Sequence, residues 1–329
     1  MTTAPAPSPR VVSLLPSATE IVCAVGGATL LVGRSHECDH PAAIADRPVL
    51  TAPAGPMTGD SRTIHERVEA HLAAALSVYE VDAPRLRSLG PSVIVTQDLC
   101  EVCAVARPDV EAAVAGAAGN DRPTIVSLDP KTLGDIFADV RRVGEALGMA
   151  ARADQVATEL AARAEGVNER PGASGPSVLA IEWIDPVMIG GLWMHEVIAR
   201  AGGRPLGPPP GAYAETVDRA ALAQLDPDVV LIKPCGMSTA RAREEVATLA
   251  RTLPWTEWRA AARGAVFIVD GNAYFNRPGP RIVASIEVAA ACIAAATGRA
   301  SRWSDRHGHD IWRVASDLSS RPLRDPPRG

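Results

Sequence analysis

Four of the six cysteines lie in polar loops that follow apolar segments of the sequence. Cys38 lies in S-H-E-C-D, Cys100 and Cys103 frame the sequence C-E-V-C, and Cys235 lies in P-C-G. Two intervening residues allow both thiolates of C-E-V-C to face one metal ion or to form a redox pair. A zinc or iron–sulfur site of four thiolates would have to recruit the separate loops. The four loop cysteines therefore have three interpretations: packed thiols at a cleft rim, a metal site or a redox pair.

Aromatic side chains form a second group of candidates, late in the chain. They make up only 4% of the residues, yet Trp183, Trp193 and Tyr274 all lie at or just after apolar segments. A large flat ligand is bound by such aromatic faces, and ordinary core packing is the alternative.

Polar donors accompany these aromatic residues in the sequence G-N-A-Y-F-N-R-P-G-P-R. Asn272, Arg277 and Arg281 suit carboxylate, amide or phosphate groups on the edge of a ligand, because a guanidinium donates in a fixed fork. Arg281 has the alternative of capping its own helix. The density of polar and aromatic groups favours a binding site here.

Composition and motifs exclude several other functions. A net charge of -5 and the absence of any block of basic residues disfavour nucleic acid and anionic membranes as partners. The apolar segments are short, so membrane insertion is not expected. The sequence contains neither a dinucleotide-binding G-x-G-x-x-G after a strand, nor a P-loop, nor a G-x-S-x-G elbow.

Short apolar strands alternate with Ala-rich helical segments along the chain, which predicts an α/β fold with parallel sheets. The expected strands and helices are listed here: strands 10–15, 30–34, 93–96, 124–128, 177–183, 229–232 and 265–269; helices 64–76, 110–118, 133–147, 150–168, 194–201, 240–250 and 280–297. Ser17 is expected to cap the first helix, with Glu20 completing a capping box and Gly26 and Gly27 ending the helix.

This pattern predicts two α/β lobes with a helical strut between them. The expected organisation is a disordered N-terminus (1–9), an N-terminal lobe (10–148), a linker helix (149–170), a C-terminal lobe (171–300) and a polar, loosely attached tail (301–329). A strut of this length would span roughly 30 Å at about 1.5 Å per residue.

Five segments carry a resemblance to a known family: R-V-V-S-L-L-P-S-A-T-E-I, S-H-E-C-D-H-P, L-A-I-E-W-I-D-P, D-P-D-V-V-L-I-K-P-C-G and V-D-G-N-A-Y-F-N-R-P-G-P-R. Together they resemble the cobalamin-binding, helical-backbone (class III) substrate-binding proteins of ABC transporters, over roughly Arg10 to Arg299. The resemblance implies two Rossmann-like lobes joined by one long helix, with the ligand in the cleft between the lobes. Side chains at the carboxyl ends of the strands would bind it.

His36 is the most ligand-like histidine, since it lies in a polar loop beside Glu37. An imidazole there is suited to be the axial ligand of a corrinoid cobalt, or a general base assisted by Glu37. The alternative is a loop histidine that is hydrogen-bonded to the backbone. The full set of predicted ligand-binding residues is Ser17, His36, Glu37, Gln97, Glu182, Trp183, Trp193, Asn272, Tyr274, Arg277 and Arg281.

The leading hypothesis is an intracellular binding protein for cobalamin, a related corrinoid or another metal-bearing cofactor. The alternative is an enzyme on the same scaffold that uses an iron–sulfur or zinc site of Cys38, Cys100, Cys103 and Cys235. The segment Met1–Pro9 has neither the basic nor the apolar region of an export signal, which predicts a cytoplasmic location. Transporter docking is doubtful on that expectation, and Glu20 is only a loose candidate for a docking acid.

Overall fold

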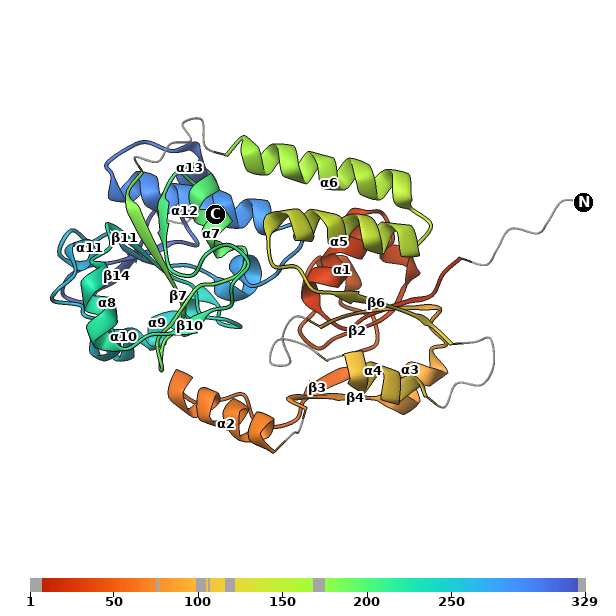
Figure 1. The fold of residues 1–329 in the computed structure, drawn as a ribbon. Coiled ribbons are helices and arrows are strands. Elements are labelled where there is room, and N and C mark those ends of the chain that lie inside the picture. Colours follow the sequence, from red (N-terminus) through yellow and green to blue (C-terminus); the bar gives the residue numbers. More distant parts are fainter. Residues whose placement is uncertain are drawn as a thin grey trace, which may run out of the picture. The chain divides into compact units, whose positions relative to one another are not determined.

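The computed structural model describes residues 8–74, 77–98, 105, 107–115, 122–167 and 175–324. The chain forms two compact units (Figure 1), and each is considered by itself. The first unit comprises residues 1–57, 66–130 and 134–159, and the second comprises residues 58–65, 131–133 and 160–329. Most of the expected disordered N-terminus, residues 1–7, lies outside the described residues, as do Cys100 and Cys103.

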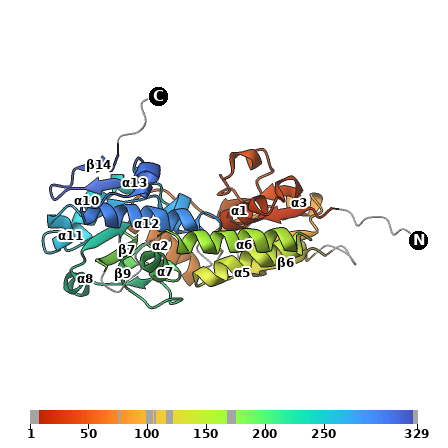
Figure 2. The same ribbon diagram turned by 90° about the horizontal axis from the view of Figure 1, so that it is seen from above.

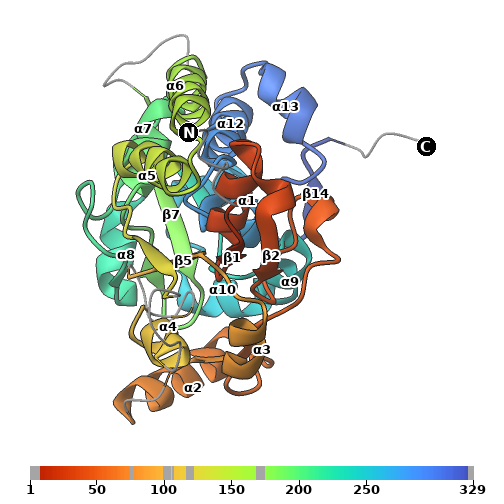
Figure 3. The same ribbon diagram turned by 90° about the vertical axis from the view of Figure 1, so that its right-hand side faces the viewer.

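A four-stranded parallel sheet forms the centre of the first unit, in the order β2-β1-β5-β6. Its strands are β1 (Val11–Ser13), β2 (Leu31–Arg34), β5 (Val93–Gln97) and β6 (Thr124–Leu128). β1 and β5 are buried along their whole length, as expected for central parallel strands covered on both faces. Figure 3 shows β1, β2 and β5 beside helix α1 (Pro16–Ala24).

The expected N-cap of α1 is wrong. Leu15 is the N-cap residue and Pro16 lies in the first turn, while Ser17 is buried inside the helix and makes no capping bond. Proline takes this position because its fixed φ suits the helix and its missing N–H would have had no partner there. The helix ends as expected, since Gly26 follows its C-cap with a φ of 94°.

Further elements of the first unit surround the sheet. The strands β3 (Thr51–Pro53) and β4 (Tyr79–Val81) form an antiparallel pair. The remaining helices and 3-10 turns are η1 (Ala28–Leu30), η2 (Ala42–Ile44), α2 (Ser61–Ala73), α3 (Ala83–Ser88), α4 (Arg107–Val114), α5 (Leu133–Ala146) and α6 (Ala150–Glu165). The division into units falls inside α2, near the start of α5 and inside α6.

Helices α5 and α6 run side by side in the first unit (Figures 1 and 2), with an ion pair of 2.8 Å between Arg141 Nε and Asp154 Oδ1. Gly144 makes their close approach possible, because a Cβ at this position would lie only 2.1 Å from the Cβ of Ala153. A glycine inside a helix lowers the helix propensity, so the packing explains its presence.

An eight-stranded mixed sheet forms the centre of the second unit. Its core is parallel, as expected, and consists of β9 (Arg204–Leu206), β7 (Ser177–Trp183), β11 (Val229–Ile232) and β12 (Val266–Ile268). Antiparallel strands extend it on both sides, namely β8 (Met188–Ile189), β10 (Glu215–Thr216), β13 (Trp312–Val314) and β14 (Ser320–Pro322). The expectation of parallel sheets therefore holds for the four-stranded sheet of the first unit and for the core of the second, but not for the pair β3–β4 or the added antiparallel strands.

The helices of the second unit are α7 (Met194–Arg200), α8 (Arg219–Leu225), α9 (Thr239–Glu244), α10 (Val246–Thr252), α11 (Arg259–Ala262), a π-helical turn η4 (Gly271–Phe275), α12 (Ile282–Ala296) and α13 (Arg302–His307). The expected helix 240–250 is two helices, because Ser238 caps α9 and the chain bends at Glu245. No helix in the described parts of the chain has the length and apolar character needed to span a bilayer.

Residues 302–324 are not the loosely attached tail expected from their polar composition. α13 packs against α12 (Figure 2), and β13 and β14 continue the sheet beyond β12. His307 Nε2 is hydrogen-bonded to Oε2 of the buried Glu287 of α12 over 2.8 Å. A few buried anchors, Ile311 and Val314 among them, are enough to fix an otherwise polar segment.

Candidate ligand-binding site

Polar side chains gather where strands β1 and β2 of the first unit end. We call them the first-unit cluster: Ser13, Thr19, Ser35, His36, Cys38 and Thr51. Thr19 Oγ1 lies 2.8 Å from Ser13 Oγ, and Thr51 Oγ1 lies 3.0 Å from Ser35 Oγ. The carboxyl ends of parallel strands are where open α/β sheets bind ligands.

His36 is held in one orientation within this cluster. Its Nδ1 lies 2.7 Å from Thr51 Oγ1, its backbone N–H donates to the same oxygen over 3.1 Å, and its ring centroid lies 5.6 Å from that of Tyr79. Burial lowers the pKa of His36, so the ring is neutral at pH 7. With Nδ1 bonded to Thr51, the remaining ring nitrogen Nε2 is the atom that suits metal ligation.

Cys38 is a buried thiol in the first-unit cluster, and Thr19 Oγ1 donates to its sulfur over 3.0 Å. Cys235 is half-buried after β11, and its backbone N–H donates to Glu182 O over 2.9 Å. Within the described ranges, no three His, Cys, Asp or Glu side chains are grouped to hold a metal ion. The predicted four-cysteine site depends on Cys100 and Cys103, which lie outside those ranges, and it stays a prediction.

A second polar group lies at the carboxyl ends of β7 and β11 in the second unit. Its centre is Lys233, whose Nζ donates to Glu182 Oε2 and to Asn276 Oδ1, each over 2.8 Å. We call Glu182, Lys233 and Asn276 the second-unit cluster. The lysine side chain is only 1% exposed, whereas that of Glu182 is 24% exposed, so the carboxylate is the member that a ligand can reach.

The π-helical turn η4 joins this cluster to the predicted aromatic residues. Asp270 Oδ1 caps the turn by accepting from Ala273 N over 2.6 Å, and burial raises the pKa of Asp270. Gly271 allows η4 to begin against β11, since a Cβ there would lie 2.2 Å from Pro234 O. The buried Trp193 donates its Nε1–H to Phe275 O over 2.9 Å and so fixes the end of the turn.

Other predicted residues lie around η4. Arg277 is buried and donates to Asn272 Oδ1 over 3.2 Å. Tyr274 is half-buried, with its hydroxyl 3.4 Å from Asp310 Oδ2, and burial raises its pKa to about 12. The structure thus brings Glu182, Asn272, Tyr274, Trp193 and Arg277 to one region of the second unit.

Trp183 is also half-buried, but its indole has a different neighbour. Its Nε1–H donates to Ser61 O over 3.2 Å, at the start of α2. Ser61 Oγ in turn lies 2.5 Å from the carboxylate of the buried Glu245. The segment 58–65 therefore packs on the second unit through Trp183.

The remaining predicted residues are less accessible or bonded elsewhere. Ser17 and Gln97 are 2% and 4% exposed, so neither presents much surface to a ligand. Arg281 occupies the N-cap position of α12, but its side chain makes no capping bond. Glu37 is half-buried beside His36, and Glu20, the loose docking candidate, is 4% exposed in α1.

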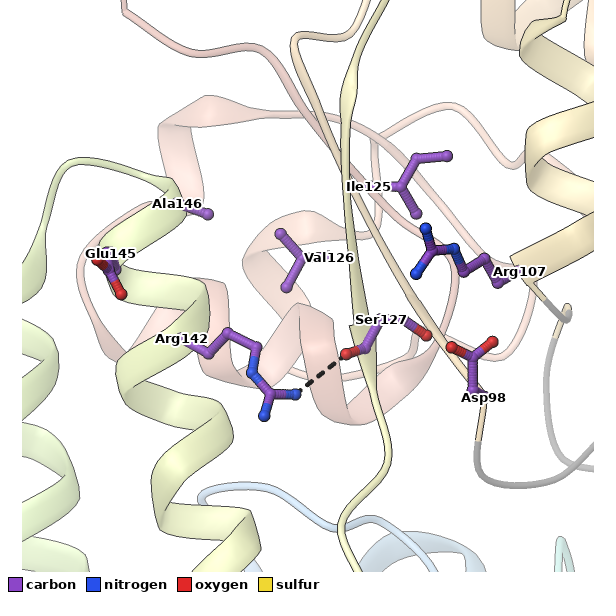
Figure 4. Close-up of a pocket in the computed structure, with 8 residues that line it drawn as sticks. All are labelled: Asp98, Arg107, Ile125, Val126, Ser127, Arg142, Glu145 and Ala146. Atoms are coloured by element: carbon purple, nitrogen blue, oxygen red, sulfur yellow. Dashed lines mark hydrogen bonds between the residues drawn. The ribbon is translucent and has the colours of Figure 1, made fainter.

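A pocket of about 470 Å³ lies in the first unit beside β6 (Figure 4). Its charged groups balance one another. Arg142 donates to Ser127 O over 3.1 Å and pairs with Asp139 over 2.9 Å, while Arg107 pairs with Glu111 over 2.7 Å. Because its arginines already have partners, this pocket is a weaker candidate than the two clusters.

Six residues of these clusters were not in the predicted set: Ser13, Thr19, Ser35, Thr51, Lys233 and Asn276. Lys233 carried a signal, because a lysine that directly follows the apolar strand V-V-L-I lies at the carboxyl end of a central strand. Thr51 and Asn276 carried none, since their roles depend on contacts with His36 and Lys233 from distant parts of the chain.

Comparison with solved structures gives the same fold at low sequence identity. A periplasmic heme-binding protein from Pseudomonas aeruginosa is 21% identical with a TM-score of 0.65, covering 97% of this chain and 99% of its own. The periplasmic heme-binding protein RhuT from Roseiflexus sp. RS-1 is 20% identical with a TM-score of 0.66, covering 88% and 99%. The periplasmic vitamin B12 binding protein BtuF of Vibrio cholerae is 17% identical with a TM-score of 0.61, covering 89% and 99%.

Comparison of the sequence with curated proteins finds no match. The model of the periplasmic binding protein family, however, matches residues 11–273, which is most of the chain. That span includes the parallel strands of both sheets and every residue of the two clusters except Asn276. The chain belongs to the periplasmic binding protein family.

Proposed function

We propose that this protein binds a metal-bearing tetrapyrrole and that a corrinoid of the cobalamin type is its ligand. The observation that carries the proposal is the orientation of His36, whose Nδ1 is bonded to Thr51 while burial keeps the ring neutral. A neutral imidazole with one nitrogen anchored is the form that ligates cobalt or iron through the other.

The second unit supports the same proposal with a different kind of group. Glu182 presents a partly exposed carboxylate that the buried Lys233 holds in one orientation. A corrinoid carries many amide side chains, and a fixed carboxylate accepts hydrogen bonds from amide N–H groups. Tyr274 adds a half-buried aromatic side chain in the same region.

Solved relatives with this fold include proteins named as heme-binding and as vitamin B12 binding, and both ligands are metal-bearing tetrapyrroles. The amide groups at the edge of a corrinoid are uncharged and donate N–H hydrogen bonds, whereas the propionates of heme are anionic. A partly exposed carboxylate at Glu182 favours the corrinoid, because two propionates would be repelled by it.

Isothermal titration with hydroxocobalamin, cyanocobalamin and hemin tests the choice of ligand. We expect saturable binding of hydroxocobalamin, weaker binding of hemin and a loss of discrimination in Glu182→Gln. Binding of hemin alone would replace the corrinoid by heme within the same proposal, and binding of none of the three would overturn it.

Two further expectations from the sequence belong to this proposal. The cytoplasmic location is tested by fractionating cells that express the natural gene, and transporter delivery by co-purification with a membrane permease.

The enzymatic alternative rests on Cys100 and Cys103. Iron, zinc and sulfide analysis of protein purified without oxygen tests it, with Cys100→Ala as the matched variant.

A further inference from the structure

A pocket of about 510 Å³ in the second unit is lined by cationic and hydroxyl side chains. Its lining residues are Ala262, Arg263, Gly264, Arg313, Ala315, Ser316, Ser319, Ser320 and Arg321. Three of these are arginines, three are serines and none is acidic. Arg263 and Gly264 precede β12, whereas the second-unit cluster follows the strands, so this pocket lies at the opposite edge of the sheet.

The arginines of this pocket lie close to one another because of the strand register. Arg313 of β13 and Arg321 of β14 are directly paired across the antiparallel ladder. Residues paired in this way point to the same face of a sheet, and like charges at such positions repel one another. A bound anion between the two guanidinium groups would remove that cost.

None of these three arginines forms an ion pair with a carboxylate in the described part of the chain. Arg313 donates from Nε to Gly264 O and from Nη2 to Arg263 O, and both acceptors are uncharged carbonyls. Neither Arg263 nor Arg321 forms an ion pair with a described residue. The arginines of the pocket beside β6, Arg107 and Arg142, each pair with a carboxylate, so the two pockets differ in this respect.

Nearby charges are directed elsewhere or add to the positive field. Asp317 lies on the turn between β13 and β14, but its Oδ1 accepts from the backbone and hydroxyl of Ser319 on the same turn. Arg243 stacks on Trp312 and donates from Nε to Ser320 Oγ over 3.4 Å. Asp228 interacts with Arg263, yet it also bonds Ser177 over 2.8 Å.

The backbone around the pocket is preorganised. Gly264 has a φ of 61°, which side-chain-bearing residues rarely adopt, and this turn aims its carbonyl oxygen at Arg313. Trp255 donates its Nε1–H to Ser316 O over 3.1 Å and fixes the start of the serine-containing turn. The Arg313 guanidinium is therefore held in place before any anion binds.

We propose that this pocket binds the phosphate group of a small organic phosphate ester. Guanidinium groups bind phosphate oxygens in pairs, and serine hydroxyls supply the additional donors. The volume lies in the range of small-molecule sites, so it accommodates an organic substituent beside the phosphate. This site is separate from the proposed tetrapyrrole site and does not depend on it.

Titration at constant ionic strength with phenyl phosphate, inorganic phosphate and chloride tests the proposal, by calorimetry. We expect saturable binding of phenyl phosphate at millimolar concentration or below and no saturable response to chloride. The double variant Arg263→Gln/Arg321→Gln should weaken binding at least about tenfold.

Arg204→Gln is the matched control, because Arg204 is an exposed arginine of β9 outside the pocket. It should leave phenyl phosphate affinity unchanged. Thermal unfolding in phosphate-free buffer shows whether the double variant is folded; if it is not, Ser320→Ala replaces it and should weaken binding measurably, because Ser320 Oγ accepts from Arg243 and keeps its own proton for a phosphate oxygen. Absence of saturable phenyl phosphate binding, or an equal loss in Arg204→Gln, would overturn the proposal.

Discussion

Lys233 Nζ lies 2.8 Å from Glu182 Oε2, and the two members of this ion pair differ sharply in burial. The lysine side chain is 1% exposed and the glutamate side chain 24% exposed. Taking an ammonium group out of water is costly unless partners compensate it. Removing Glu182 should therefore lower the stability of the fold more than removing Lys233. The pair holds β7, β11 and η4 together, because Asn276 accepts from the same ammonium group.

Glu182→Gln is therefore expected to lower the free energy of unfolding by about 1–3 kcal/mol, since it leaves a buried cation without its counter-charge. Lys233→Met should cost less, because the partly exposed Glu182 can be hydrated. Urea unfolding of both variants measures the difference. Glu257→Gln, which removes the exposed partner of Arg219, is the control and should cost under about 1 kcal/mol. A larger loss in Lys233→Met than in Glu182→Gln would contradict this account.

Asp139 makes the stability of the first unit depend on pH. Its side chain is 2% exposed, and burial raises its pKa to about 7 despite a 2.9 Å contact with Arg142. Between pH 4 and pH 7 the folded state holds a proton that the unfolded state has lost, so stability falls as pH rises through this window.

Asp139→Asn should remove this dependence and should stabilise the protein at pH 8 relative to the parent. Unfolding curves at pH 4.5, 6 and 8 measure it, with Asp154→Asn as the control, because Asp154 is 67% exposed. An unchanged pH dependence in Asp139→Asn would rule out this role for the carboxyl group.

Gly144→Ala should destabilise the protein, although the same change in an exposed helix stabilises it by about 1 kcal/mol. The added methyl group would lie 2.1 Å from the Ala153 Cβ, and overpacking of this kind costs about 1–3 kcal/mol. Ala153→Gly in the same chain restores the space. Thermal unfolding should show partial recovery in the double variant, and simple additivity of the two losses would argue against the contact.

The expected strands match the structure best where the sequence alone determines burial. The runs at β6, β7 and β11 begin and end as predicted, because each is a run of mainly apolar, β-branched residues bounded by turn residues. Ser17 misled the prediction because both Pro16 and Ser17 favour a helix start, and the proline takes the first turn. The polar composition after residue 301 hid strands that are fixed by pairing with β12 rather than by their own apolar content.

The candidate site could be predicted only in part, for a similar reason. His36 and Glu182 were predicted because a polar residue at or just after the carboxyl end of an apolar strand has a known place in parallel sheets. The contacts that orient them come from Thr51 and Lys233. One sequence does not show that Thr51 lies within hydrogen-bond distance of His36, or Lys233 within that distance of Glu182. The charged pocket beside β14 was missed because it depends on the pairing of Arg313 with Arg321.

Ligand binding through His36 should weaken in acid. Its pKa is lowered by burial from an ordinary value of 6.5, so the ring is neutral at pH 7 and becomes protonated only at lower pH. A proton on Nε2 excludes the metal, so hydroxocobalamin affinity should be constant above pH 7 and fall only at a pH below the ordinary value of 6.5. Thr51→Val should lower affinity at all pH values, because Nδ1 loses its anchor. Affinity that rises in acid would contradict the proposed role.

The visible spectrum of hydroxocobalamin mixed with the purified protein tests the central claim most directly. The account predicts the spectral shift of imidazole coordination at cobalt in the parent protein, and its loss in His36→Ala with at least about tenfold weaker binding. His65→Ala, a change at a half-buried histidine of α2 outside the first-unit cluster, should keep both the shift and the affinity. An identical shift in the parent and in His36→Ala, or no binding by the parent, would contradict the account.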